Sequence, residues 1–168
     1  MTAADIFVIL RYCQFEKNNY QNRFFADGKW WTMRVSKKTE RILDKRYLHR
    51  AEDWAKITKK YPVLKKVEPI IESDLSWMND YSSLWKWNTH IIDVARELLG
   101  IKTKCLLDGE TGLKGTDRLR FICQKFNADT YLSGPSGRNY LELDKFEKAG
   151  IKVEFFEPTD KRPLCELL

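Results

Sequence analysis

The sequence has few of the residues that build metal centres or covalent cross-links. Its 168 residues include only four cysteines, at positions 13, 105, 123 and 165, and two histidines, with no C-x-x-C pair. This spacing excludes a zinc ribbon or a dense disulfide framework, so we expect reduced thiols, no bound metal and no cofactor. No run of about 18 apolar residues occurs, so no membrane-spanning helix is predicted.

The first residues also lack the basic and apolar regions of a secretory signal peptide, so we expect a cytoplasmic protein. Apolar material, by contrast, is plentiful, because 43% of the residues are hydrophobic and 13% are aromatic. Such a composition excludes a disordered chain. The length suits one domain, and we therefore predict a single domain over residues 1–168.

The positive charge is concentrated in one segment. The chain carries a net charge of +6, and residues 34–66 hold 12 Lys and Arg against 4 Asp and Glu, a local balance of +8. One interpretation is a solvated helix and loop surface. The alternative is a binding module for nucleic acid or an acidic protein surface, which would use this segment through its charge.

Apolar runs and turn residues predict alternating strands and helices. Ile6–Leu10 is typical of a buried strand, and Asp27-Gly28 between two aromatic-rich runs indicates a hairpin over residues 23–35. Other strands are expected at 39–43, 101–107, 130–132 and 151–156, and helices at 49–61, 73–99, 116–126 and 139–149. The pattern predicts an α/β fold with a mixed, mostly parallel sheet, flanking helices and an aromatic-rich hairpin near the N-terminus.

A Gly- and Ser-rich loop after the strand at 130–132 is the first candidate site. It contains Ser133, Gly134, Ser136, Gly137 and Arg138. Backbone N–H groups at the start of a following helix suit a phosphate or carboxylate, and glycines let a ligand approach the backbone. The alternative is a plain turn with serine caps. Ser136 is a weak candidate nucleophile, because the G-x-S-x-G spacing is absent.

Two further groups of polar residues could assist such a loop. Gln14, Asn22 and Arg23 bracket a polar stretch between strand candidates, and amides with a guanidinium suit sugar hydroxyls, carboxylates or phosphates. Their alternative role is to satisfy buried loop backbone. Thr116 or Asp117 is expected to cap the helix that runs to about Phe126. Arg118 at the start of this helix is either a ligand partner or a solvated side chain.

One thiol and several tryptophans leave further alternatives open. Cys13 lies in a polar stretch and is a weak candidate nucleophile, because a reactive thiol needs a nearby base or cation. Five tryptophans could stack on a sugar or base or could fill the core: Trp30, Trp31, Trp77, Trp85 and Trp87.

Several stretches match the sequence pattern of one known family, and they occur in the same order along the chain. They are 7–10, 14–15, 21–23, Trp31, Val35, Asn88, 91–92, 98–101, 117–119, 122–123, 131–141, Phe146 and 150–155. On these residues the chain resembles the WbqC-like protein family, and the loop from Tyr131 to Leu141 is the most specific part. The resemblance adds Asn88 and Tyr140 to the expected ligand-binding residues.

The family takes its name from bacterial O-antigen gene clusters. The resemblance therefore implies polysaccharide biosynthesis, with an anionic ligand such as a nucleotide-sugar or an activated acyl or aminoacyl donor. If the protein is an enzyme, the resemblance implies an acyl-, aminoacyl- or glycosyl-type transferase.

The chain also departs from the family pattern. The usual N-terminal strand with its His/Gln-Pro motif is expected to be lacking, Arg11-Tyr12 stand where paired acids are usual, and the part after Phe156 is short. These departures suggest a short, divergent member, with an inactive structural subunit as a further alternative. The sequence does not indicate an oligomeric state.

Overall fold

The computed structural model describes residues 3–38, 41–67 and 82–168. The described residues form two compact units. Unit 1 comprises Met1–Asp108 with Arg162–Leu168, and unit 2 comprises Gly109–Lys161. The single domain over residues 1–168 stays a prediction.

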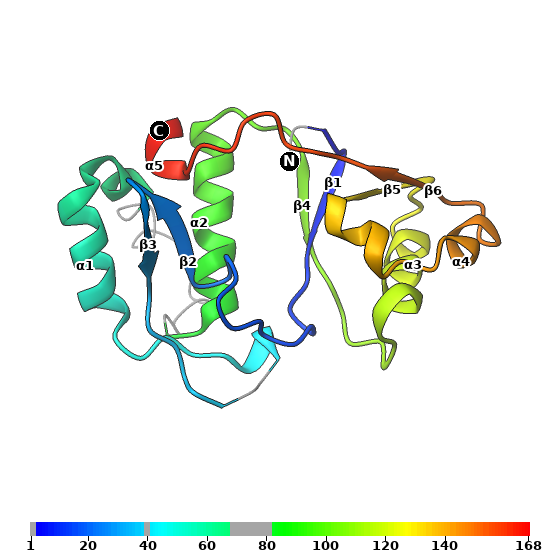
Figure 1. The fold of residues 1–168 in the computed structure, drawn as a ribbon, viewed down its shortest axis with the longest axis horizontal. Coiled ribbons are helices and arrows are strands. Elements are labelled where there is room, and N and C mark those ends of the chain that lie inside the picture. The colour runs from blue at the N-terminus through cyan, green and yellow to red at the C-terminus, as the bar shows by residue number, and fades with distance from the viewer. Residues whose placement is uncertain (1–2, 39–40, 68–81) are drawn as a thin grey trace. The chain divides into compact units, whose positions relative to one another are not determined.

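Each unit contains both short strands and helices (Figure 1). Unit 1 contains β1 (Ile6–Ile9), β2 (Arg23–Ala26), β3 (Lys29–Thr32), η1 (Ile42–Asp44), α1 (Arg50–Lys60), η2 (Pro62–Val67), α2 (Leu84–Leu98), β4 (Lys104–Leu107) and α5 (Leu164–Leu167). Unit 2 contains α3 (Gly115–Lys125), β5 (Thr130–Ser133), η5 (Pro135–Asn139), α4 (Leu143–Glu147) and β6 (Lys152–Phe155). The η elements are 3-10 helices.

The described strands pair two by two. Strands β1 and β4 are parallel with Ile6 opposite Lys104, and β5 and β6 are parallel with Thr130 opposite Lys152. Strands β2 and β3 form an antiparallel hairpin. The α/β class, the predominance of parallel pairing and the aromatic-rich hairpin are therefore confirmed.

The hairpin turn has the backbone conformation that Asp-Gly predicts. Asp27 has φ 50° and Gly28 has φ 72°, and a type I′ turn needs positive φ at both central positions. The Asp27 carboxylate accepts a hydrogen bond from the Tyr61 hydroxyl at 2.9 Å, just beyond the end of α1. This hydrogen bond lowers the pKa of Asp27 and ties the turn to α1.

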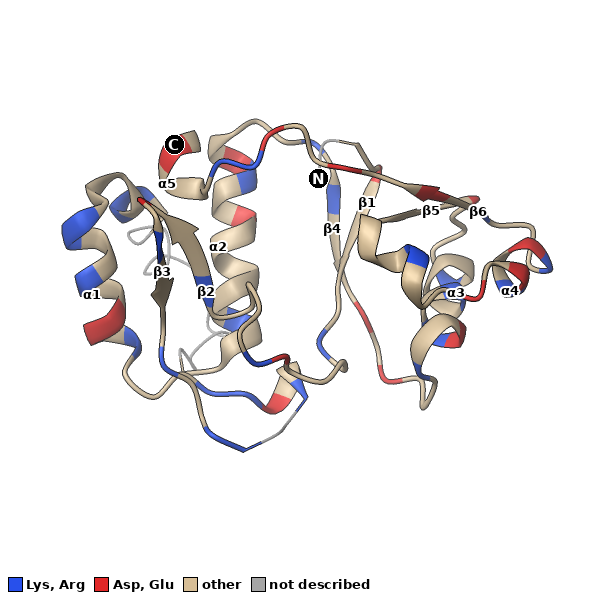
Figure 2. Ribbon diagram, viewed as in Figure 1, with Lys and Arg blue, Asp and Glu red and all other residues tan. Residues whose placement is uncertain are grey.

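The core of unit 1 lies between α1, α2 and the hairpin. Helix α1 contributes Trp54 and Ile57 at i and i+3, and α2 contributes Trp87 and Val94 at i and i+7, as helical periodicity predicts. All four side chains are buried. The charged residues of α1 lie at its remaining positions, where Figure 2 marks them in blue and red.

Unit 2 has a smaller core of its own. Phe146 of α4 is fully buried and packs with Cys123 and Ile151. Its ring stacks on Tyr131 of β5, with the centroids 5.2 Å apart and the planes 10° apart. None of the helices in the described part of the chain is long and apolar enough to cross a membrane.

The prediction of an edge strand at 39–43 is wrong for residues 41–43, which are the ones that the structure describes. Residues 39–40 lie outside the described residues, Arg41 makes an isolated bridge to Gln14, and Ile42–Asp44 is a 3-10 helix. The N–H groups of adjacent Ile42 and Leu43 donate to the carbonyls of Cys13 and Arg11, both at 2.8 Å. Adjacent N–H groups of a strand point to opposite sides and could not do this.

Two expected helices also need correction. The helix over 139–149 is wrong at its start, because the N–H groups of Tyr140 and Leu141 both donate to the Gly137 carbonyl and close a turn. Helix α4 begins only at Leu143. In the expected helix over 73–99, α2 confirms the later part, and 73–81 lie outside the described residues.

The cap expected at Thr116 or Asp117 is also wrong. Helix α3 already begins at Gly115, and its N-cap position is Lys114. The Thr116 hydroxyl instead accepts a hydrogen bond from the Glu142 N–H at 3.2 Å.

A buried carboxylate joins the carboxyl ends of β1 and β4. The Asp108 side chain is fully buried and accepts hydrogen bonds from the backbone N–H groups of Arg11, at 2.9 Å, and Tyr12, at 3.4 Å. The Arg11 guanidinium lies 3.5 Å from the same carboxylate and 4.7 Å from the Trp85 ring centroid. This contact was not predictable from the sequence, because Asp108 stands in a Gly-rich loop far along the chain from Arg11.

Replacing this carboxylate tests its structural role. Asp108→Asn removes the charge and leaves buried donors with a weaker acceptor, so we expect the free energy of unfolding to fall by about 2 kcal/mol. Asp44→Asn is the control, because Asp44 pairs with Arg41 at the surface and such pairs contribute less than about 1 kcal/mol. Urea denaturation measures both changes, and equal losses in the two variants would contradict this role.

Candidate functional site

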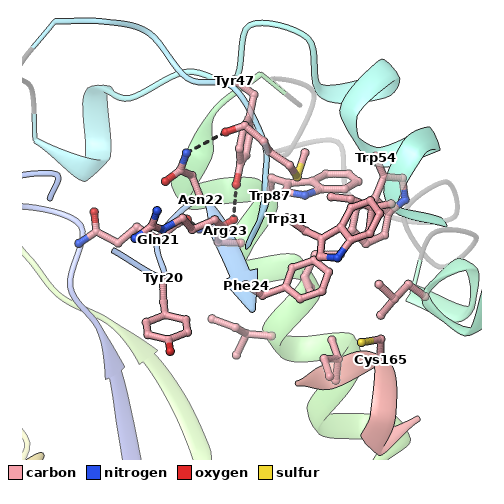
Figure 3. A pocket seen from close by; sticks show the side chains of 17 residues that line it. Tyr20, Gln21, Asn22, Arg23, Phe24, Trp31, Tyr47, Trp54, Trp87 and Cys165 are labelled. Atoms are coloured by element: carbon pink, nitrogen blue, oxygen red, sulfur yellow. Dashed lines mark hydrogen bonds between the residues drawn. The ribbon is translucent and has the colours of Figure 1, made fainter. Parts of the chain in front are cut away.

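Unit 1 contains an aromatic cavity of about 260 Å³ (Figure 3). Strands β2 and β3, helices α1, α2 and α5, and the loop before β2 all contribute to its lining. The lining residues are Tyr20, Gln21, Asn22, Arg23, Phe24, Trp31, Met33, Tyr47, Trp54, Ile57, Leu64, Trp87, Asn88, Ile91, Ile92, Leu164 and Cys165. Most of these side chains are apolar or aromatic, so the cavity suits an apolar group.

One face of the hairpin lines the cavity. Phe24 and Trp31 are opposite each other in the β2–β3 register, and both lie edge-on to Tyr61, with centroids 5.9 and 5.3 Å from it. Their neighbours Phe25 and Trp30 are 46% and 40% exposed on the other face. The period of two along a strand therefore separates the cavity wall from the outer surface.

Two almost fully buried tryptophans, from different helices, form one wall of the cavity. Trp54 of α1 and Trp87 of α2 meet edge to face, with ring centroids 5.4 Å apart and an interplanar angle of 82°. Both are almost fully buried. The interpretation of Trp87 as a core residue is thus confirmed, while Trp77 lies outside the described residues.

Amide side chains fix the polar side of the cavity. Asn88 of α2 accepts a hydrogen bond from the Tyr47 hydroxyl at 2.7 Å and donates to the Gln21 carbonyl at 2.6 Å. Asn22 donates to the Met33 carbonyl at 2.8 Å (Figure 3). Burial raises the pKa of Tyr47, so its hydroxyl remains protonated at neutral pH. These bonds hold the loop before β2 against α2.

Arg23 is a lining residue whose guanidinium lies toward the outer face of the hairpin, where Trp30 stands. Its guanidinium carbon lies 3.9 Å from the ring centroid of Trp30, and one terminal nitrogen donates to the Asn18 carbonyl. Among the residues that the structure describes, the buried Arg23 Nε has no hydrogen-bond partner, and the same is true of the Trp54 indole Nε1. Unpaired buried donors are costly, and an acceptor oxygen on a ligand would satisfy them.

The structure brings some of the predicted residues together. Asn22, Arg23 and Asn88 line this one cavity, although the two amides also satisfy loop backbone, as the alternative proposed. Gln14 is exposed and is not among the lining residues. Cys13 is half-buried, also outside the lining, and its carbonyl anchors Ile42.

Sequence reasoning missed several of the lining residues. Tyr47 stands in the basic segment 34–66, whose charge predicts a surface and not a cavity wall, and Leu164 and Cys165 lie far along the chain from the other lining residues. The spacing of Trp54 and Ile57 predicted a helix face but not a cavity. Residues from such separate segments carry no common signal in a single sequence.

The Gly- and Ser-rich loop lies in unit 2. It forms β5's last residue and the five-residue 3-10 helix η5, not the start of a longer helix. Ser133 and Gly137 are buried, whereas Gly134, Ser136 and Arg138 are exposed and Tyr140 is 58% exposed. The Arg138 guanidinium lies 4.2 Å from the ring centroid of Phe155. These residues therefore share one loop, and their role toward a ligand stays a prediction.

The loop itself gives a reason for glycine at position 137. A Cβ there would lie 2.1 Å from Ser133 Oγ and 3.0 Å from Leu141 Cδ1. At Gly134 a Cβ would meet nothing within 4 Å. Internal packing therefore requires Gly137 whether or not a ligand approaches.

Arg118 and Asp117 engage other parts of unit 2. Arg118 is buried, and one of its terminal nitrogens donates to the Gly109 carbonyl at 3.3 Å, so the solvated alternative is wrong. Asp117 accepts a hydrogen bond from Lys145 at 2.8 Å, which lowers the pKa of Asp117. Asp117 therefore connects α3 to α4, and Arg118 connects α3 to the loop that precedes α3.

Two glycine variants separate packing from ligand binding in the loop. We expect Gly137→Ala to lower the free energy of unfolding by about 1–3 kcal/mol without any ligand, because the new methyl group overlaps Ser133. Gly134→Ala is the matched control and should leave stability nearly unchanged, since φ is −68° and the space is open. Combining Ser133→Ala with Gly137→Ala should recover part of the loss. Thermal unfolding measures all three, and equal stability of the two glycine variants would refute the packing explanation.

Comparison with known proteins identifies the family. The chain is similar to Uncharacterized protein Rv1507c of Mycobacterium tuberculosis, with 32% identity over 79 residues, which is 46% of this chain and 34% of that relative. The matched segment thus spans about a third of the relative's length. No solved structure matches the chain. The model of the WbqC-like protein family matches residues 1–163, and the chain therefore belongs to the WbqC-like family.

Proposed function

We propose that this protein binds an anionic small molecule through the aromatic cavity of unit 1, with the apolar part of the ligand inside. The favoured ligand is an activated acyl or aminoacyl donor, and the favoured setting is the modification of sugars for a bacterial surface polysaccharide. The setting rests on the family resemblance, and the ligand class rests on the cavity.

Unsatisfied donors in an apolar site support the proposal. Within the described part of the chain, Arg23 Nε and the indole Nε1 atoms of Trp31 and Trp54 are buried without a hydrogen-bond partner, and all three residues are among the lining residues of the cavity. A ligand with acceptor oxygens would complete these bonds, and the aromatic walls would exclude water from its apolar part. The positive charge of Arg23 favours a carboxylate or phosphate.

The size of the cavity favours an acyl donor over a nucleotide-sugar. A volume of about 260 Å³ falls just below the usual range of about 300–1,000 Å³ for sites that enclose a drug-sized ligand. It can hold one acyl chain or one ring, and the rest of a larger donor would remain outside. Apolar walls suit an acyl chain better than a sugar with many hydroxyl groups.

The cavity is built for binding more than for nucleophilic attack. Cys165 is the thiol among its described lining residues, and burial raises the pKa of this thiol, which lowers its thiolate fraction. Neither Cys13 nor Ser136 is among the lining residues. A transferase reaction would therefore need an acceptor that supplies its own nucleophile, such as a sugar hydroxyl or amine.

Ligand titration tests the proposal. We expect at least one of a series of acyl-coenzyme A thioesters to raise the melting temperature of the protein, and UDP-sugars to bind more weakly. Arg23→Gln should weaken that binding tenfold or more, because a charge-assisted hydrogen bond contributes about 1.5–3 kcal/mol. Isothermal titration calorimetry measures the affinity.

The matched control is Lys17→Gln, which removes one positive charge from an exposed residue of the loop that precedes β2. It should leave the affinity unchanged, and circular dichroism should show that both variants are folded. No response to any member of the series, or equal affinity of Arg23→Gln and the wild type, would refute the proposal.

A further inference from the structure

A cluster of exposed aromatic side chains lies on the outer face of the β2–β3 hairpin. The rings of Tyr20 and Phe25 both make edge-to-face contacts with Trp30, with centroids 5.1 and 5.4 Å from it. Tyr20 is 70% exposed, and Phe25 and Trp30 are exposed as well. We name these three residues the outer cluster.

The contacts within the outer cluster favour a flat ligand. Single exposed apolar side chains are common on protein surfaces, whereas a contiguous group of large rings marks an interaction surface. Because the rings already hold one another in place, a ligand that stacks on them immobilises few additional side-chain bonds. Exposed aromatic rings are the side chains on which nucleic-acid bases stack.

A cation accompanies the outer cluster. The Arg23 guanidinium carbon lies 3.9 Å from the Trp30 ring centroid, and one terminal nitrogen donates to a backbone carbonyl. Arg23 forms no ion pair within the part of the chain that the structure describes, so its charge is available to a ligand. The acid of the hairpin, Asp27, lies in the turn and is engaged by Tyr61 and Lys60 at 2.9 and 3.3 Å. An anionic group beside the outer cluster is therefore attracted by Arg23.

The outer cluster adjoins the aromatic cavity. Tyr20 and Arg23 are among the lining residues of that cavity, and both also contact Trp30. Phe25 and Trp30 are not among the lining residues. A ligand whose apolar part fills the cavity can therefore extend past Tyr20 and Arg23 and place its remaining part on the outer cluster.

We propose that the outer cluster binds the adenine nucleotide of an activated acyl donor, with the base stacked on the rings and a phosphate at Arg23. The inference deepens the proposed function and rests on it for the acyl part of the donor. A purine gains more from stacking than a pyrimidine, because its flat face is larger. A neutral saccharide would also stack on these rings but would gain nothing from the charge of Arg23.

Adenosine 3′,5′-bisphosphate is the probe for the outer cluster. We expect the wild type to bind it in calorimetry, and the double variant Phe25→Leu/Trp30→Leu to bind it at least tenfold more weakly, because leucine keeps the surface apolar but removes the stacking rings. The control is Phe121→Leu, which removes an equally exposed ring from α3 of unit 2. This control should bind the probe like the wild type.

A pair of thioesters separates this inference from the proposed function. We expect an acyl-coenzyme A to bind at least tenfold more tightly than the matching acyl-4′-phosphopantetheine, which lacks the adenine nucleotide. The double variant should remove that difference and leave the affinity for acyl-4′-phosphopantetheine unchanged, since neither substituted residue lines the cavity. The unchanged affinity would also show that the double variant is folded.

Four results would overturn the inference while leaving the proposed function intact. They are an absence of adenosine 3′,5′-bisphosphate binding, equal weakening in the double variant and in Phe121→Leu, equal affinity of the wild type for the two thioesters, and tighter binding of maltose than of the bisphosphate. Binding of the bisphosphate that only the double variant weakens, without any binding of acyl-4′-phosphopantetheine, would instead refute acyl binding in the cavity and still support nucleotide binding on the outer cluster.

Discussion

The contact between Trp54 and Trp87 is the one on which unit 1 depends most. It joins α1 to α2 through two large side chains that are both almost fully buried. Aromatic pairs of this kind bury much apolar area and have a preferred edge-to-face geometry, so they fix the relation of two helices as well as stabilising it. The hairpin then closes over this pair, and the aromatic cavity is the space that these large rings leave unfilled.

Polar contacts decide where the loops lie around that core. Asp27 joins the hairpin turn to Tyr61 at the end of α1, and Asn88 joins α2 to both Tyr47 and the loop before β2. Each of these groups is satisfied by another part of the protein. Arg23 and Trp54 differ from them, because each retains a buried N–H without a partner in the described part of the chain. Within this cavity, the unsatisfied donors make Arg23 and Trp54 the candidate binding residues.

Local pattern sufficed to predict most of the elements from the sequence. Asp27-Gly28 identified the hairpin, and the apolar spacing of α1, α2 and α3 identified three helices, because these signals are contained within one segment. The error at Ile42–Asp44 arose because hydrogen bonds to a distant segment decided the conformation. The start of α4 was displaced for a similar reason, through the turn at Gly137.

The candidate site was predictable only in part. Asn22, Arg23 and Asn88 were identified, but the aromatic walls were not, because they come from four separate parts of the chain. The glycines of the loop from Ser133 to Arg138 predicted a ligand site, and at Gly137 the structure explains the glycine by packing against Ser133. Glycine-rich sequence is therefore an ambiguous signal until the space around each glycine is known.

Ligand binding among the tryptophans of unit 1 is tested most directly by nuclear magnetic resonance. On titration with an acyl-coenzyme A thioester, we expect the indole N–H signals of Trp31 and Trp54 to shift. We expect the backbone amide signals of residues 133–140 to remain in place. Shifts of those amides with unchanged indole signals would contradict binding in the aromatic cavity and assign the ligand to the loop of unit 2.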